Sequence, residues 1–180
     1  MNKIIFLDLD DTLFDTTQYA SKTFNVPSFS LHNKLHIVKN LLPIIKVWLK
    51  IKNNPSFWEN IPLKKDALLI YEKSNKISSD IHILTALPSF FYKKNSISFK
   101  LASEAKKISV QKNLPNIKPE NIHICYSTEK HLVIKNNPSR FILVDDSATN
   151  IKNWEKAGGT GILVEPNSQK HLFTLNYLIK

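Results

Sequence analysis

Six of the chain's 15 acidic residues fall in two short segments. Asp8, Asp10, Asp11 and Asp15 lie in the first segment, and residues 145–146 form the second. Because Asp8 and Asp10 are two residues apart, an extended backbone points both side chains to one face. Neighbouring carboxylates repel each other, so this spacing favours a site rather than stability. With Asp145 they form the hard oxygen set that Mg²⁺ prefers.

Four apolar runs each lead into a polar or charged side chain. The runs and the residues that follow them are 4–7 with Asp8, 81–84 with Thr85, 122–125 with Lys130, and 141–144 with Asp145. One such aspartate alone would be an ordinary turn residue. In open α/β sheets, however, ligands bind beyond the carboxyl ends of the strands. A lysine charge and a threonine hydroxyl there could hold phosphate oxygens, so the pattern predicts a combined metal and anion site.

The elements that must position these residues follow from the hydrophobic pattern. The four runs and a fifth at 161–164 are short, continuous and rich in Ile, Val, Leu and Phe, as in strands buried on both faces. Helical patterns lie at 62–75, 97–110 and 147–157. In the third, Ser147 is a good N-cap and Gly158 a good stop. The alternation predicts an α/β fold with right-handed crossovers.

The helix at 97–110 is expected to bury one stripe of side chains. That stripe is Phe99, Leu101, Ala105 and Ile108. The helix at 62–75 is expected to begin at Pro62, since proline suits the first helical position.

Residues 16–60 contain no convincing strand. Helices are expected near 15–24, 31–40 and 43–53, with prolines between them. Lysines flank the apolar stripe of the second and third helices, as in helices that bind a membrane surface or nucleic acid. We favour the simpler interpretation, a small helical cap that packs its stripe inward and solvates its lysines.

Composition restricts the class of protein. The chain has 180 residues, 42% of them hydrophobic, which fits one soluble domain or a core with a modest insertion. Its net charge of +10 suggests nucleic acid or an anionic membrane as partners. Cys125 is the single cysteine, which excludes an internal disulfide and a cysteine-built zinc site. Without a signal peptide or a run of about 20 apolar residues, we expect a cytoplasmic protein with no membrane partner.

Four segments together resemble a known superfamily. DLDDTLFDT (8–16) resembles motif I, DxDx[TV], of the haloacid-dehalogenase-like (HAD) superfamily, and ILTALP (83–88) resembles motif II. Lys130 is in place for motif III, and VDDSATN (144–150) is similar to motif IV. The resemblance implies a Rossmann-like, doubly wound parallel sheet with a C1-type cap after the first strand. It divides the chain into a core of 1–15 and 61–180 and a cap of 16–60.

The same resemblance implies a chemistry. In that superfamily the first aspartate, here Asp8, becomes an aspartyl-phosphate, and the second, here Asp10, is general acid and then base. P-type ATPases have threonine at the second position and dehalogenases also lack the acid, so a phosphatase is implied. The implied ligands of Mg²⁺ are Asp8, the carbonyl of Asp10, Asp145 and Asp146. The implied phosphate-binding residues are Thr85, Ala86 and Lys130.

A finer resemblance links residues 54–73, 80–88 and 127–130 to the 5'(3')-deoxyribonucleotidases. It implies a (deoxy)nucleoside monophosphate as substrate and a substrate-side lysine downstream of motif II. Lys100 is the best match, with Lys94 as competitor. Cap aromatics sandwich the base in that family, which would assign Phe57 and Trp58 this role. Ordinary packing between cap and core is the alternative for these two rings.

Other partners remain open. A phosphatase of nucleic-acid ends would line a channel to the pocket with lysines, and another phosphometabolite is also possible as substrate. A non-catalytic, basic nucleic-acid-binding protein on the same scaffold is a further alternative, although it gives no reason to keep the whole set of site residues. The chain is expected to be a monomer or a homodimer. His82 and His123 fall inside strands and are interpreted as structural.

Overall fold

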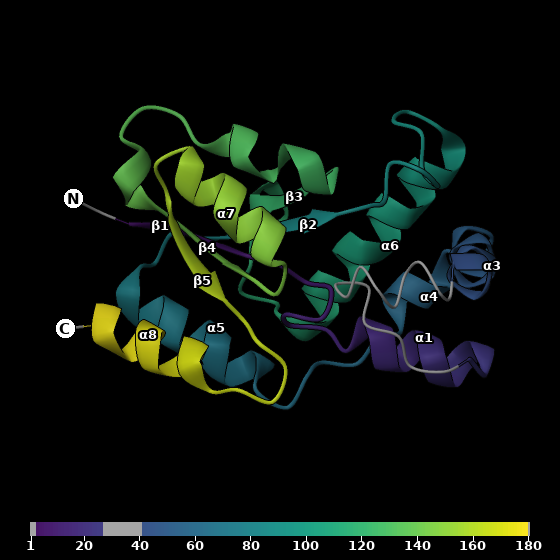
Figure 1. Ribbon diagram of the computed structural model, residues 1–180, viewed down its shortest axis with the longest axis horizontal. Coiled ribbons are helices and arrows are strands. Elements are labelled where there is room, and N and C mark those ends of the chain that lie inside the picture. Colours follow the sequence, from purple (N-terminus) through teal and green to yellow (C-terminus); the bar gives the residue numbers. More distant parts are fainter. Residues whose placement is uncertain (1–2, 27–40, 180) are drawn as a thin grey trace.

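The computed structural model describes residues 3–26 and 41–179. Its centre is a five-stranded parallel sheet in the order β3-β2-β1-β4-β5 (Figure 1). The strands are β1 (Ile4–Leu7), β2 (Ile81–Ala86), β3 (Ile122–Cys125), β4 (Phe141–Asp145) and β5 (Thr160–Leu163). All five lie where the apolar runs predict them. Strand β2 runs two residues further than the pattern, so Thr85 and Ala86 belong to the strand itself.

Side chains alternate along each strand, and the sheet has a buried cluster of hydrophobic residues on each face. On β1, Ile5 and Leu7 pack into the larger core cluster, which includes Ile70. Phe6 points to the opposite face and packs against Trp154, with ring centroids 5.5 Å apart. Apolar residues on every position of β1 are therefore required by its central place in the sheet.

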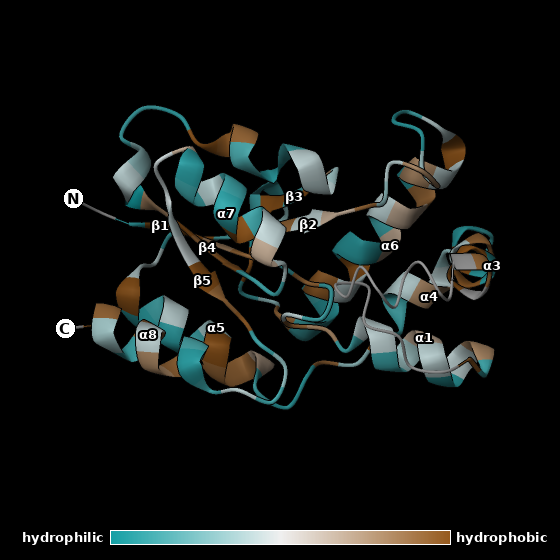
Figure 2. Ribbon diagram, viewed as in Figure 1, coloured by the Kyte–Doolittle hydropathy of each residue, from teal (hydrophilic) through white to brown (hydrophobic). Residues whose placement is uncertain are grey.

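Helices cover both faces of the sheet. Helices α5 and α8 lie side by side on one face, and α7 lies on the other (Figure 1). Figure 2 shows the strands as a hydrophobic centre between helices that carry hydrophilic residues. The helices of this layer arrangement are α5 (Ala67–Ile77), α6 (Ile97–Asn113), α7 (Ala148–Lys156) and α8 (Lys170–Leu178). Short 3-10 turns occupy η1 (Pro119–Asn121), η2 (Ser127–Val133) and η3 (Pro138–Arg140).

The start of α5 differs from the expectation. The helix begins at Ala67 and not at Pro62. The carbonyl of Pro62 accepts from the amide of Asp15, and the amide of Lys64 donates to the carbonyl of Leu13. These bonds hold residues 62–64 against the loop after β1, so the chain cannot turn into a helix before this contact ends. Helix α8 was not predicted from the sequence pattern.

The ends of α7 agree with the sequence. The Ser147 hydroxyl accepts from the amide of Asn150 at 3.4 Å, as an N-cap does. Gly158 follows the helix with φ of +90°, a left-handed conformation that favours glycine. At Gly159 a Cβ atom would stand 2.3 Å from Nε1 of Trp154, so only glycine fits there without displacement of the ring.

Three further helices lie together at the end of the molecule toward which the strands run (Figure 1). They are α1 (Thr16–Phe24), α3 (Leu41–Lys52) and α4 (Ser56–Glu59). Ile44, Phe57 and Trp58 belong to the same buried cluster as residues of the sheet. The helix expected at 31–40 lies outside the described residues, and the boundary of the cap at residue 60 stays a prediction. Among the described helices, none is both long and apolar enough to cross a membrane.

Candidate active site

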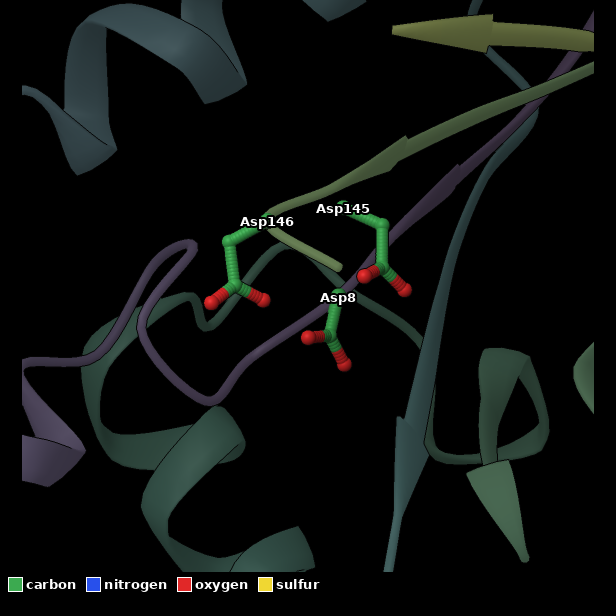
Figure 3. A group of neighbouring side chains, drawn as sticks. All are labelled: Asp8, Asp145 and Asp146. Atoms are coloured by element: carbon green, nitrogen blue, oxygen red, sulfur yellow. The ribbon is translucent and has the colours of Figure 1, made fainter. Parts of the chain in front are cut away.

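Three carboxylates meet where two neighbouring strands end. Asp8 directly follows β1, Asp145 ends β4 and Asp146 follows it (Figure 3). Strands β1 and β4 are paired in register, and the amide of Asp8 donates to the carbonyl of Val144 at 2.9 Å. One oxygen from each carboxylate lies within 4.8 Å of the other two. The pairing of the two strands thus brings together acids that are 137 residues apart in the sequence.

Lys130 lies between two of these acids. Its Nζ donates to Oδ1 of Asp8 and to Oδ2 of Asp145, each at 2.6 Å. All three side chains are buried. Burial alone would lower the pKa of the Lys130 ammonium, but the two carboxylates outweigh it and raise that pKa above its ordinary value. Lys130 is thus a buried cation whose charge both acids require.

The Asp8 carboxyl has an unusual environment. Burial raises its pKa well above the ordinary value, Lys130 opposes this shift, and the neighbouring Asp145 adds to it. A carboxylate with little water around it and more acids beside it favours a bound cation.

Asp145 and Asp146 are held by the start of α7 and by the loop after β1. The carboxylate of Asp145 accepts from the amide of Ser147 at 2.7 Å and from Nδ2 of Asn150 at 3.0 and 3.1 Å. The amide of Asp146 donates to the hydroxyl of Thr12 at 3.0 Å. These bonds orient both acids toward Asp8, and the capping of α7 is therefore part of the site's construction.

Asp10 stands beside this cluster but has a different set of partners. Its Oδ1 accepts from the hydroxyl of Thr16 at 2.9 Å. Its Oδ2 accepts from the hydroxyl of Thr85 at 3.3 Å and pairs with the ammonium of Lys106. About a quarter of its side chain is exposed, 26%. The Asp10 carboxylate is therefore fixed separately from the three acids that meet around Asp8, and only its backbone carbonyl remains as a proposed metal ligand.

A tight turn places Asp8 and Asp10 differently. The carbonyl of Leu9 accepts from the amides of residues 12, 13 and 14, and the amide of Asp11 donates to the carbonyl of Phe14. Asp11 itself has φ of +57°. Its carboxylate accepts from the amide and the hydroxyl of Thr17, and burial raises its pKa to about 6. The turn thus separates the roles of three aspartates that are close in sequence.

These side chains line a cavity of about 610 Å³. Its wall includes Asp8, Asp10, Lys130, Asp146, Ala86 and Trp48. Trp48 contributes an aromatic surface from α3. Such a volume accommodates a small organic molecule.

The structure brings most of the expected site residues together, and leaves some apart. Asp8, Lys130, Asp145 and Asp146 form one group, Asp10 and Thr85 form a second, and residues of both groups line one cavity together with Ala86. Lys100 is exposed, and Lys94 is exposed with its ammonium 2.8 Å from Glu129, so neither reaches the cavity. Phe57 and Trp58 are 2% and 1% exposed. Both rings are buried, and one face of Trp58 meets the ammonium of Lys106, which favours the packing alternative over a base-stacking role for them.

Two residues at this site, Lys106 and Trp48, were not predicted from the sequence. Lys106 is buried because α6 packs through its small residues, Ala102, Ser103, Ala105 and Ser109. The expected stripe was wrong in part, since Leu101 and Ile108 are half exposed. The signal for a buried cation was the position of Lys106 within a stripe of small side chains. Lys106 lies four residues after Ala102 and three before Ser109.

The residues at this site fit a divalent cation. Asp8, Asp145 and Asp146 carry three carboxylates against the single ammonium of Lys130, so the cluster has an excess of negative charge. Their oxygens are hard ligands at spacings that one ion can bridge. Among the described residues they form the one cluster of at least three acidic, histidine or cysteine side chains close enough to share an ion.

Comparison with known proteins leads to solved structures alone. No protein-family model and no curated protein matches the chain. The HAD hydrolase YfnB of Bacillus subtilis, solved with magnesium, is similar at 14% identity and a TM-score of 0.55, with 99% of each chain covered. A HAD-like hydrolase of Xanthomonas campestris is similar at 13% identity and a TM-score of 0.54, with 98% of this chain and 91% of that chain covered.

A third structure is CbbY of Rhodobacter sphaeroides, solved with phosphate. It is similar at 16% identity and a TM-score of 0.51, with 92% of this chain and 87% of that chain covered. At such low identities a structural likeness establishes the fold and not the reaction. The chain has the α/β fold of the HAD-like hydrolases, with the acids of its cavity at the ends of β1 and β4.

Proposed function

We propose that the protein is a Mg²⁺-dependent phosphomonoesterase that works through an aspartyl-phosphate. The observation that carries this proposal is the separation of two carboxylates on one cavity wall. Asp8 is buried against Lys130, whereas Asp10 is partly exposed and held by hydroxyls and a second lysine. Two acids in different environments can take different roles in one reaction.

In the first step, an oxygen of Asp8 attacks the phosphorus of the substrate and the bond from phosphorus to the leaving oxygen breaks. Asp10, in its protonated form, gives its proton to the leaving oxygen. The products are an alcohol and the acyl phosphate of Asp8, which is the aspartyl-phosphate. Lys130, 2.6 Å from the attacking carboxylate, offers a positive charge to the phosphoryl oxygens. The Thr85 hydroxyl, which donates to Asp10 in this structure, is the proposed second donor once that bond is exchanged for one to the phosphoryl group.

In the second step, Asp10 takes a proton from a water molecule, which attacks the phosphorus of the aspartyl-phosphate. The bond between phosphorus and Asp8 breaks, phosphate leaves, and both acids return to their starting states. Asp8, Asp145, Asp146 and the backbone carbonyl of Asp10 are the proposed metal ligands. When bound there, Mg²⁺ neutralises the acids and so reduces the repulsion between Asp8 and an anionic substrate. The magnesium reported with the similar Bacillus protein and the phosphate with CbbY support this assignment.

For the substrate we propose a small phosphomonoester, with (deoxy)nucleoside monophosphates as the first class to test. The Trp48 surface on the cavity wall is suited to a flat base. A phosphatase of nucleic-acid ends would need a cationic channel. Of the residues that the structure describes along the cavity, Lys130 is the only lysine. This favours a small molecule over a nucleic-acid end.

A phosphate-release panel tests the proposal. It contains Mg²⁺ with nucleoside 5'- and 3'-monophosphates, sugar phosphates and phosphorylated oligonucleotides. We expect release from at least one nucleotide, loss of activity with a chelator, and no release by Asp8→Asn despite an unchanged circular dichroism spectrum. Asp10→Asn should trap a phosphorylated protein, visible as a mass increase of one phosphoryl group.

Two results would contradict the proposal. Near-wild-type turnover by Asp8→Asn would show that another group is the nucleophile. Salt-sensitive DNA binding without any Mg²⁺-dependent turnover would instead favour the non-catalytic, nucleic-acid-binding alternative.

A further inference from the structure

Lys106 is a buried lysine without a role in the reaction described above. It lies in the middle of α6 and is 1% exposed. Its Nζ donates to the hydroxyl oxygen of Thr85 at 2.9 Å and pairs with Oδ2 of Asp10. On another side it lies over the ring of Trp58, 4.2 Å from the centroid. A buried ammonium is costly unless partners surround it, and these three groups are its partners.

The contacts of Lys106 form a closed set around Asp10. The Thr85 hydroxyl accepts from Lys106 and donates to Oδ2 of Asp10, while Thr16 donates to Oδ1. Three donors, from α1, β2 and α6, therefore hold the carboxylate of Asp10. Because Lys106 is buried behind Asp10, its ammonium does not line the cavity in which a substrate would bind.

Trp58 connects this set to the helices beyond the strand ends. It belongs to α4, which packs against α6. Its indole Nε1 donates to the hydroxyl of Tyr92 at 3.4 Å, and its ring packs edge to face with Phe57. The π face that meets the Lys106 ammonium offers the attraction of a cation–π contact where water is excluded. The placement of α4 thus limits where the ammonium of Lys106 can stand.

We infer that Lys106 is a positioning residue, which holds the Asp10 carboxylate in place for proton transfer and is itself held by Trp58. This role rests on the proposed phosphatase function and adds to it a structural link from α4 to the acid–base group. Lys106 acts through Asp10 and does not touch the substrate. Its removal should therefore reduce the rate of the chemical step and leave substrate binding unchanged.

The test compares Lys106→Met with the matched control Lys107→Met. The methionine keeps the length and apolar contacts of the lysine stem and removes the ammonium. Lys107 is the next residue on the same helix, its side chain is 41% exposed, and it pairs with Glu104 at 2.8 Å. With para-nitrophenyl phosphate and Mg²⁺, we expect kcat of Lys106→Met to fall about tenfold to a hundredfold, with KM within about twofold of wild type. Lys107→Met should match wild type in both.

A second background separates positioning from general damage to the fold. If Lys106 acts through Asp10, then adding Lys106→Met to Asp10→Asn should not slow hydrolysis of the phosphorylated protein any further. Lys106→Gln, which keeps a donor, should have a kcat between those of wild type and Lys106→Met. It also replaces the methionine variant in the test if that variant does not fold.

The outcomes are distinguishable. If the wild-type protein is active and Lys106→Met has the same kcat, the positioning role of Lys106 is overturned and the proposed phosphatase function is not. A raised KM with an unchanged kcat would overturn it in favour of substrate contact, and additive losses with Asp10→Asn would overturn it in favour of an independent role. Wild-type protein that releases no phosphate from any phosphomonoester would overturn the proposed function, and the role of Lys106 with it.

Discussion

Replacement of Lys130 by methionine should destabilise the protein strongly when no metal is present. The Lys130 ammonium is bonded at 2.6 Å to Asp8 and at 2.6 Å to Asp145, and all three groups are buried. Removal of one partner from a buried ion pair costs about 3–5 kcal/mol, because the remaining charge stays without compensation. That is a large fraction of the roughly 5–15 kcal/mol by which a domain is stable. For a chain of this length the Tm should fall by about 6–20 °C.

The assay is urea unfolding followed by circular dichroism, with a chelator present and then with Mg²⁺. In the chelator we expect the full loss, and with Mg²⁺ a smaller one, because a cation bound to Asp8 and Asp145 replaces part of the missing charge. The double variant Asp8→Asn with Lys130→Met isolates the cause. It removes one of the two acids that the lysine compensated, and should be about 1–3 kcal/mol more stable than the sum of the single changes predicts.

Two results would refute this reasoning. One such result is a free energy of unfolding for Lys130→Met within about 1 kcal/mol of the wild-type value. The ion pairs of Lys130 with Asp8 and Asp145 would then behave like solvent-exposed pairs, and the site would be open to water. If the double variant lost the plain sum of the two single losses, the destabilisation would come from lost packing rather than from uncompensated charge.

Three further predictions concern regions outside the cavity. Burial, and to a smaller extent the neighbouring His82, lowers the pKa of His123, so the folded state favours the neutral imidazole. The contribution of neutral His123 to stability is lost as the pH falls below about 6.5. In urea titrations, His123→Gln should therefore lose less stability than wild type between about pH 8 and pH 5. Burial raises the pKa of the Cys125 thiol to about 11, so a thiol-reactive dye should label it slowly in native protein and rapidly in urea; fast native labelling would contradict this. Gly159→Ala places a Cβ atom 2.3 Å from Nε1 of Trp154 and should cost about 1–3 kcal/mol, with a shift in tryptophan fluorescence; an unchanged unfolding midpoint would show that the ring moves freely.

The sheet could be predicted from the sequence because its strands are buried on both faces. A continuous run such as residues 4–7 or 141–144 has no solvent-facing position, and that requirement is visible in the residues themselves. The cap of α7 at Ser147 could be predicted because the bond to Asn150 spans only three residues. The start of α5 could not, because bonds from the distant loop after β1 hold residues 62–64.

The rotation of a helix about its own axis was the main source of error. On α6, the larger residues Leu101 and Ile108 suggested one buried face, but the helix packs closely through alanine and serine. The close approach turns Lys106 inward to Asp10 and leaves Lys100 exposed. Small side chains contribute little to a hydrophobic pattern, although they allow the shortest distance between elements. Which face is buried then depends on the neighbouring element.

The sequence by itself determined where the polar and charged side chains stand relative to the strands. Each apolar run leads into a polar or charged residue, and in parallel sheets such residues lie where ligands bind, beyond the ends of the strands. The tertiary structure decided which groups serve which acid. Lys130 joins Asp8 to Asp145, Lys106 joins Asp10 to Thr85, and Trp58 is buried against Lys106. These partners come from separate elements, and the packing of those elements against one another is a property of the whole chain.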